Sequence, residues 1–363
     1  MTKNRLKIIC PECANNLVKD LDNSSYYCKN CNSNFSIYQV NGYEIIDFVS
    51  NDLKFTKGFS ADDDMLMFKK LLNVFDEVDF YGLVKIYQTF SSTSDDNNFK
   101  MIIPKPKSIN EYDLNHGKDS LRKVESISMN MGKQINYDGV ALENGSGYGF
   151  FCYEFAKRFK HLYVTDCSMC YLLLGIKFII QNQKIFSDSE NLIEKVSFCR
   201  CNIEKLPLSN NSVDFIHSNQ VIEHVSNQQR YLEEMNRVVQ EDLGLVYVVS
   251  PNRYSALPEP HYRLRFFGLY PTVIANYLLR HRNLTTDAVT PLSLKVLRNK
   301  LKVTFEKNFI IIGFFQNLSI ANPSKLKNII SNLGKLNLVN YLLNNILIVI
   351  LPCHYILASK KKS

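Results

Sequence analysis

The sequence lacks the features that mark several classes of non-globular protein. Its 363 residues contain no internal repeat at solenoid periods and no long low-complexity run, which excludes repeat and collagen-like architectures. Hydrophobic residues make up 45% of the chain and charged residues 21%, and this balance is too apolar for wholesale disorder. The length predicts about two domains, or one large domain with attachments.

A secretion signal and an unbroken membrane-spanning run are also missing. Residues 1–9 are polar and basic with only a short apolar end, so we expect a protein that is not secreted. The one stretch of spanning length, residues 338–358, includes three asparagines, a proline and a histidine, which disfavour a spanning helix. We therefore expect a cytoplasmic protein, with peripheral attachment at the inner membrane face as the alternative.

Acidic residues are scarce in the last third of the chain. Residues 251–363 carry 16 Lys and Arg but only 3 Asp and Glu, whereas residues 1–50 are balanced and residues 51–250 are net acidic. The overall charge of +8 therefore belongs to the last third, where we expect any anionic partner to bind. Residues 338–351 read as an amphipathic helix, for which core packing and peripheral membrane contact are the two interpretations.

Cysteines are plentiful, and four of the ten form two CxxC pairs near the start. Cys10 and Cys13 precede Cys28 and Cys31, with 14 residues between the pairs. Two such knuckles supply four thiolates to one tetrahedral zinc. A redox dithiol, a disulfide pair and unliganded buried thiols are the alternatives. Residues 1–50 hold too few apolar side chains for an independent core, so we expect the metal to provide the folding energy there.

Residues 51–135 read mostly as helix and form a connector. Asp62, Asp63 and Asp64 precede an apolar stripe at helical spacing over residues 65–75, which is typical of an acid-rich first turn and a packing surface. A second helix is predicted over residues 118–131.

A strand, a glycine-rich turn and a helix follow. Residues 138–143 form a short apolar run that ends in Glu143, then Gly145, Gly147 and Gly149 precede a helical stretch over residues 150–159. Such glycines let a ligand lie against the turn and the helix N-terminus. A dinucleotide site is a weaker interpretation, because its fingerprint is G-x-G-x-x-G and the third glycine here comes one position early.

Three further strands lead into polar residues. Residues 161–166 end in Asp166, whose carboxylate suits the two hydroxyls of a ribose, although a helix N-cap would look similar. Residues 196–200 lead into Asn202–Pro207, and residues 212–218 lead into Glu223 and His224. Cys167 and Cys170 form a third CxxC pair; we interpret them, with Cys199 and Cys201, as buried thiols.

Residues 136–252 resemble the class I S-adenosylmethionine (SAM)-dependent methyltransferases, specifically the group that includes the quinone-biosynthesis methyltransferases. The family's acid-x-Gly-x-Gly-x-Gly motif corresponds to Glu143–Gly149, its adenine motif to Asn202–Pro207, and its fourth-strand motif to Val213–Val225. Asn202 departs from the usual Asp but retains a carbonyl oxygen that can accept from an amino group. Residues 6–43 resemble the zinc ribbon that is fused to many methyltransferases.

The resemblance implies an α/β fold with a Rossmann-like, seven-stranded, mostly parallel sheet whose last strand is antiparallel. The expected organisation is a zinc ribbon over residues 1–50, the connector over 51–135, and a methyltransferase core over 136–363. A substrate-covering insertion is expected at about residues 253–290. Within the core we expect a helix over residues 291–300 capped by Thr290, a sixth strand over 302–315, and the last strand over 353–359.

The resemblance also implies SAM as cofactor beside a structural zinc. The expected cofactor-binding residues are Glu143, Gly145, Gly147, Gly149, Asp166, Cys167, Asn202, Ile203 and Asn219. Because a sulfonium donor already has a good leaving group, the enzyme must chiefly align the acceptor and, where needed, remove a proton. The candidate bases are His224 and His261, against pocket-shaping or loop-packing roles. The candidate substrate-binding residues are Asn252, Arg253, Tyr262 and Arg263.

Three functions remain in competition. The leading one is methylation, most naturally at oxygen, of a small-molecule or lipid/glycan-linked acceptor that is drawn by the basic last third. The second is RNA methylation, which the ribbon and the charge favour but the missing Asn-Pro-Pro-aromatic motif after the fourth strand disfavours. The third is a non-catalytic scaffold that binds a partner through the ribbon and connector.

Overall fold

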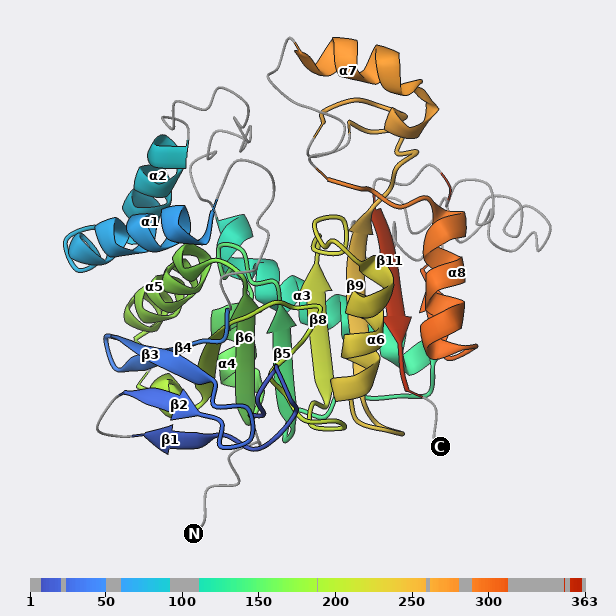
Figure 1. Cartoon of the computed structure of the whole chain (residues 1–363). Helices are drawn as coiled ribbons and strands as arrows, with labels where there is room; N and C mark the ends of the chain where they lie inside the picture. Colours follow the sequence, from blue (N-terminus) through green and yellow to red (C-terminus); the bar gives the residue numbers. More distant parts are fainter. Residues whose placement is uncertain are drawn as a thin grey trace.

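The computed structural model describes residues 8–20, 24–49, 60–91, 111–187, 189–258, 262–280, 289–312, 349 and 353–360. One sheet of eleven strands runs through the middle of this part of the chain (Figure 1). Its core strands follow the order β7 (Val196–Arg200), β6 (His161–Asp166), β5 (Val140–Asn144), β8 (Phe215–Asn219), β9 (Leu245–Pro251), β11 (Cys353–Ala358) and β10 (Phe309–Ile311).

These seven strands confirm the predicted fold class. Neighbours from β7 to β9 are all parallel, and β11 lies antiparallel between β9 and β10. The parallel strands therefore bring their carboxyl ends to one edge of the sheet, where open α/β folds place their ligands.

The N-terminal strands extend this sheet instead of standing apart from it. β1 (Val18–Asp20), β2 (Ser25–Tyr27), β3 (Asn34–Val40) and β4 (Tyr43–Asp47) pair antiparallel in chain order. β4 then pairs parallel with β7, in the register Ile45↔Phe198. The backbone of β7 would otherwise form an exposed edge, so this pairing satisfies hydrogen-bonding groups that favour aggregation when left open.

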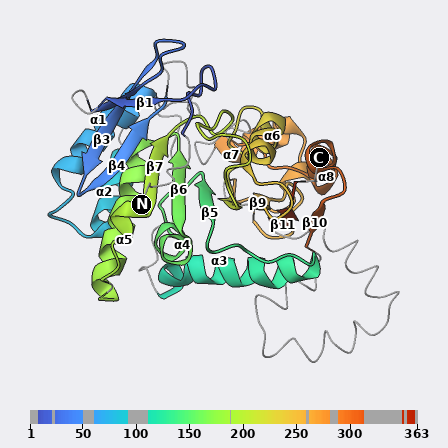
Figure 2. The same cartoon turned by 90° about the horizontal axis from the view of Figure 1, so that it is seen from below.

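Helices cover both faces of the sheet (Figure 2). α3 (Glu111–Asn130), α4 (Cys152–Arg158) and α5 (Met169–Ile185) lie on one face, and α1 (Ala61–Asn73) and α2 (Phe80–Ser91) pack with α5 into the same hydrophobic core. α6 (Gln228–Val238) and α8 (Leu294–Phe305) cover the other face, in a core that also contains buried residues of the ribbon. Short 3-10 turns, η1 (Leu192–Glu194) and η2 (Phe267–Leu269), and α7 (Thr272–Arg280) complete the described elements.

The acid-rich start predicted for α1 is confirmed. Ser60 is its N-cap, and Ser60 and Asp63 form a reciprocal capping box. Asp62 and Asp63 face the helix N-terminus, where negative charge is favourable, whereas Asp64 is fully buried. The helix predicted over residues 118–131 is α3, which begins at Glu111, seven residues earlier than predicted, and α2 lies between it and α1.

The predicted helix at 291–300 was placed too early. α8 starts at Leu294 with Ser293, not Thr290, as its N-cap, and it continues to Phe305. Leu292 forms a bridge with Asn252, so this stretch stays extended. The buried residues Leu294, Leu297, Leu301 and Phe305 recur at helical spacing. Residues 302–305, which were predicted as the start of a strand over 302–315, therefore belong to α8, and β10 has only three residues.

Within the described ranges, no helix is long and apolar enough to cross a membrane. The amphipathic helix predicted over residues 338–351 lies outside the described residues except for Val349.

Candidate cofactor site and cysteine cluster

The glycine-rich turn after β5 is fastened to the neighbouring strand. The backbone N–H groups of Gly145 and Ser146 both donate to the carbonyl of Thr165, at 2.9 and 3.1 Å. The Thr165 hydroxyl donates to the side-chain oxygen of Asn144. These bonds fix the turn at the carboxyl edge of the sheet, before the first residue of α4.

Polar atoms in this turn are buried without a protein partner. Glu143 Oε1, Asn144 Nδ2 and Ser146 Oγ make no hydrogen bond within the described structure. Leaving such groups unpaired costs about 1–3 kcal/mol each, so their clustering at one turn points to a polar ligand that is bound there.

The other oxygen of Glu143 belongs to a buried relay that the sequence did not reveal. Glu143 Oε2 lies 2.7 Å from His217 Nδ1, and His217 Nε2 lies 2.9 Å from the hydroxyl of Ser120 on α3. Burial raises the pKa of Glu143, and the adjacent His217 opposes that rise. His217 sits inside an apolar strand, β8, which was its only sequence signal.

Asp166 sits at the end of β6 and faces the glycine turn. Its two oxygens accept from the backbone N–H groups of Gly147 and Ser168, each at 3.0 Å. Burial raises its pKa to about 6. The N-cap of α5 is Ser168, whose hydroxyl accepts from Tyr171 N–H, so the alternative reading of Asp166 as the N-cap is wrong.

Two of the glycines are required for different reasons, which gives a matched pair of variants. A Cβ on Gly149 would lie 2.4 Å from the Gly175 backbone, whereas one on Gly147 meets no atom within 4 Å. Both residues have positive φ, which costs an alanine about 1–2 kcal/mol. Gly149→Ala should therefore lower the free energy of unfolding by about 3 kcal/mol.

Gly147→Ala should instead remain within about 1–2 kcal/mol of wild type in urea unfolding. Its added methyl enters open space at the residue whose N–H is bonded to Asp166. Affinity for SAM, the expected cofactor, should therefore fall at least tenfold when measured by calorimetry. Unchanged affinity in Gly147→Ala would place the ligand elsewhere.

A buried ion-pair network holds the loop after β6. Arg200, at the end of β7, lies 3.1 Å from Asp47 of β4 and 3.2 Å from Asp64 of α1. Its Nε also donates to the carbonyl of Cys167 at 2.9 Å. We call Arg200, Asp47 and Asp64 the Arg200 network.

Asp64 carries this network to the start of α5. Its carboxylate accepts from the Ser168 hydroxyl and, at 2.7 Å, from the Met169 N–H. Burial raises the pKa of Asp64, while these bonds and the Arg200 charge oppose the rise. α1 is thereby bonded directly to Ser168, and the ribbon reaches Cys167 through Arg200, so both help to set the position of the Asp166 carboxylate.

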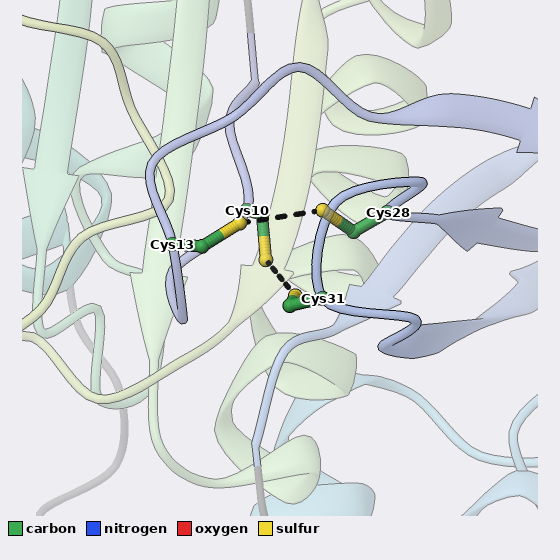
Figure 3. A group of neighbouring side chains, drawn as sticks. All are labelled: Cys10, Cys13, Cys28 and Cys31. Atoms are coloured by element: carbon green, nitrogen blue, oxygen red, sulfur yellow. Dashed lines mark hydrogen bonds between the residues drawn. The ribbon is translucent and has the colours of Figure 1, made fainter.

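The four N-terminal cysteines come together in space (Figure 3). The sulfurs of Cys10 and Cys31 lie 3.5 Å apart, those of Cys13 and Cys28 lie 3.4 Å apart, and all four fall within 4.8 Å of one another. A tetrahedral zinc with Zn–S bonds of about 2.3 Å needs sulfurs about 3.8 Å apart. The cluster fits that geometry, and all ten cysteines are free thiols, so a disulfide interpretation has no support.

The cysteine knuckle also contacts the predicted adenine motif. Ile9 N–H donates to the carbonyl of Pro207 at 3.1 Å, and Ile8 bridges Leu208. Lys205 forms an ion pair with Glu12 at 2.9 Å. The ribbon therefore supports two loops of the candidate site, one after β6 and one after β7.

Residues 142–247, which include the turn, Asp166, Asn202 and β8, match the family model described as a methyltransferase domain. The chain contains a SAM-dependent methyltransferase domain. A comparison with curated proteins gives no match.

Similar solved structures include phosphoethanolamine N-methyltransferase 2 from Haemonchus contortus, at 12% identity and a TM-score of 0.40. That match covers 66% of this chain and 52% of the other, so the chain spans about half of that protein's length. YcgJ from Bacillus subtilis is 18% identical with a TM-score of 0.40, over 70% of this chain and 100% of its own.

The remaining predicted cofactor residues of the methyltransferase domain lie at or just after the carboxyl ends of β6, β7 and β8. Asn202 is exposed, and its side-chain oxygen accepts from Glu204 N–H at 2.9 Å. Ile203 and Asn219 are half-buried. Cys170, Cys199 and Cys201 are buried as predicted, while Cys167 is half-buried. Burial raises the pKa of all four thiols.

The candidate catalytic and substrate residues of the domain differ in their surroundings. His224 is partly exposed, with its Nε2 at 3.9 Å from Glu223 Oε1, whereas His261 lies outside the described residues. The Asn252 amide donates to Val349 and accepts from Tyr254 N–H, and the Arg253 guanidinium lies 5.6 Å from the Phe267 ring. Tyr262 is buried and bonded to Val289, and Arg263 is exposed.

Proposed function

We propose that the methyltransferase domain binds SAM against the glycine turn and transfers its methyl group to an oxygen of a small-molecule or lipid/glycan-linked acceptor. The observation that carries this proposal is the combination of three buried, unpartnered polar atoms in the turn with the open space at Gly147. An ammonium group would satisfy Glu143 Oε1, and ribose hydroxyls would donate to Asp166. When bound, SAM supplies an electrophilic methyl group on a sulfonium.

The chain's own residues then orient the cofactor and manage a proton. The Ser120–His217–Glu143 relay fixes the Glu143 carboxylate, and the Arg200 network fixes the loop that carries Asp166. His224 follows β8 at the acceptor edge and is accessible, so we assign it the removal of the acceptor's proton. Proton removal matters most for a hydroxyl acceptor, because a neutral alcohol or phenol is a weak nucleophile.

Other acceptors have less support. The thiols of Cys167, Cys170, Cys199 and Cys201 have raised pKa values, so none of them offers a thiolate nucleophile for methylation of a base carbon. The RNA interpretation rested on the ribbon and the basic charge, and the ribbon's strand β4 and first knuckle are engaged with the core. We further propose that zinc occupies the cysteine cluster and that the protein is cytoplasmic.

The pH dependence of SAM affinity follows from Asp166. Its folded-state pKa of about 6 means that the carboxylate becomes protonated below that pH and accepts ribose hydroxyls less well. SAM affinity should therefore weaken by up to tenfold per pH unit below about pH 6. Calorimetry between pH 5 and 8 measures this, and Asp166→Asn should bind weakly with no such pH dependence.

The same pKa has an opposite effect on the cofactor-free fold. Burial raises the pKa above its usual value near 3.9, so the ionised carboxylate destabilises the folded state at neutral pH. This cost disappears as pH falls through about 6 toward 4, whereas cofactor affinity falls in that range. A parallel rise of stability and affinity on acidification would contradict the assignment.

The acceptor class is tested with methyl-labelled SAM. Full-length protein loaded with zinc is incubated with separated lipid, small-molecule and RNA fractions, with Asp166→Ala as the inactive control. Label should enter the lipid or small-molecule fraction as a methyl ether or ester and depend on His224. Label only in RNA would overturn the proposed acceptor, and SAM binding without transfer to any fraction would favour the scaffold.

A further inference from the structure

The insertion after β9 forms its own small core. Six buried residues pack together apart from the two cores of the sheet: Tyr262, Leu264, Phe267, Ala275, Leu279 and Val289. The rings of Tyr262 and Phe267 stack at 4.2 Å, and the Tyr262 hydroxyl both donates to and accepts from the backbone of Val289. Figure 1 shows α7 beyond the carboxyl ends of the parallel strands. The insertion is thus a defined unit on the edge where the site lies.

The outward face of α7 is apolar. Val273 is 81% exposed, Tyr277 63% and Ile274 49%, and Leu269 in the preceding turn is 69% exposed. The buried side chains of the helix, Ala275 and Leu279, lie on its opposite face. Positions 273, 274 and 277 share one side of a helix, so α7 presents apolar groups to solvent as well as to its core. Large apolar side chains clustered in water mark an interaction surface.

The charge of this unit indicates which surface it meets. Residues 260–286 contain four arginines and no Asp or Glu. Three of these arginines, Arg263, Arg265 and Arg280, are exposed in the structure. Arg280 follows Val273 and Tyr277 by seven and three positions, so it extends the same helical face. A helix that lies on a membrane surface typically has apolar side chains that enter the interface and, beside them, cations that pair with negative headgroups. The α7 unit has both kinds of side chain.

We propose that the outward face of α7 docks on an anionic lipid surface. The apolar set Leu269, Val273, Ile274 and Tyr277, which we call the α7 face, would enter the headgroup boundary while the arginines pair with lipid phosphates. Docking would help the proposed transfer reaction, because the edge of the sheet that carries the cofactor site would then face the membrane that holds a lipid-linked acceptor. This benefit rests on the proposed function, whereas the docking itself does not.

The test is sedimentation of the full-length, zinc-loaded protein with vesicles. Phosphatidylcholine vesicles containing 30% phosphatidylglycerol, on the order of the anionic fraction of natural membranes, are compared with pure phosphatidylcholine. The triple variant Val273→Ser/Ile274→Ser/Tyr277→Ser removes the apolar groups. Val303→Ser, which truncates a 71% exposed valine on α8, is the matched control. Because all four side chains are exposed, each variant should keep the wild-type melting temperature and SAM affinity.

Wild type and Val303→Ser should bind the anionic vesicles at least tenfold more tightly than the triple variant does. Wild type should also bind anionic vesicles at least tenfold more tightly than it binds neutral vesicles. Raising the salt to 0.5 M should weaken wild-type binding, since the arginine contribution is screened. Equal binding of wild type and the triple variant would overturn the proposal. So would a wild-type dimer in light scattering that the triple variant abolishes without any vesicle binding, because the face would then be a self-association surface.

The two proposals fail separately. Vesicle binding by a protein that does not bind SAM would overturn the proposed function and leave the docking intact. SAM binding without vesicle binding would do the reverse.

Discussion

Replacing Arg200 with methionine is expected to lower the free energy of unfolding by about 3–5 kcal/mol, because it leaves Asp47 and Asp64 buried without their cation. SAM affinity should fall at least 100-fold. The same side chain holds the Cys167 carbonyl and, through Asp64, the first residues of α5. Without it the loop that presents Asp166 loses its bond at Cys167, and Asp47 and Asp64 lose their shared cation.

The measurement combines urea unfolding with calorimetry of SAM binding at 10 °C. Arg158→Met is the control, since its ion pair with Glu154 is half-exposed and should contribute less than about 1 kcal/mol. If Arg200→Met does not fold, Asp64→Asn retains the shape of the buried acid while removing its charge. Either variant folded with wild-type SAM affinity would contradict a positioning role for the Arg200 network.

Removal of zinc is the second large effect. The zinc proposed for the cysteine cluster would contribute folding energy to the ribbon, so chelation should unfold the ribbon and expose the backbone edge of β7. The ribbon also holds the loop at Pro207 and, through Asp47, Arg200. Chelation should therefore weaken SAM binding at least tenfold as well as lowering the melting temperature by more than about 10 °C.

Metal analysis of freshly purified protein should find about one zinc per chain, and Cys28→Ser should reduce it. Cys199→Ser, a change at a buried thiol outside the cluster, is the control and should retain the full zinc content. A zinc-free protein that keeps its melting temperature and its SAM affinity would contradict the assignment of the cluster and its coupling to the cofactor site.

Local chemistry made the centre of the site predictable. Glu143 and Asp166 lie at the ends of short apolar strands and the three glycines follow the first of these strands, and parallel strands bring such positions to one edge. The CxxC spacing was equally informative, because ligands two residues apart within a knuckle need no knowledge of the rest of the fold. The division into residues 1–50, 51–135 and 136–363, with an insertion at about 253–290, stays a prediction.

Long-range contacts were not predictable from single positions. Ser120, His217 and Glu143 meet across 97 and 74 residues, and Arg200 meets Asp47 across 153. Each of these five residues is polar and lies inside an apolar or helical pattern. Such a pattern indicates that the side chain is buried or caps a helix, but it does not identify the residue that it contacts. The pairing of β4 with β7 was missed for the same reason, since sequence alternation does not specify a parallel neighbour.

The boundary of α8 shows a different limit. Thr290 followed by Pro291 is a typical helix start, yet Thr290 N–H is bonded to the Glu223 carbonyl and Leu292 bridges Asn252. Tertiary pairing thus kept this stretch extended, and Ser293 took the capping position.

The glycine turn and Asp166 are proposed to bind SAM together. A SAM titration of the zinc-loaded, full-length protein by calorimetry, with Asp166→Ala and Val303→Ser alongside, measures this most directly. We expect one binding site per chain in wild type and Val303→Ser, and at least 100-fold weaker binding in Asp166→Ala. The absence of binding in wild type, or equal binding by Asp166→Ala, would contradict it.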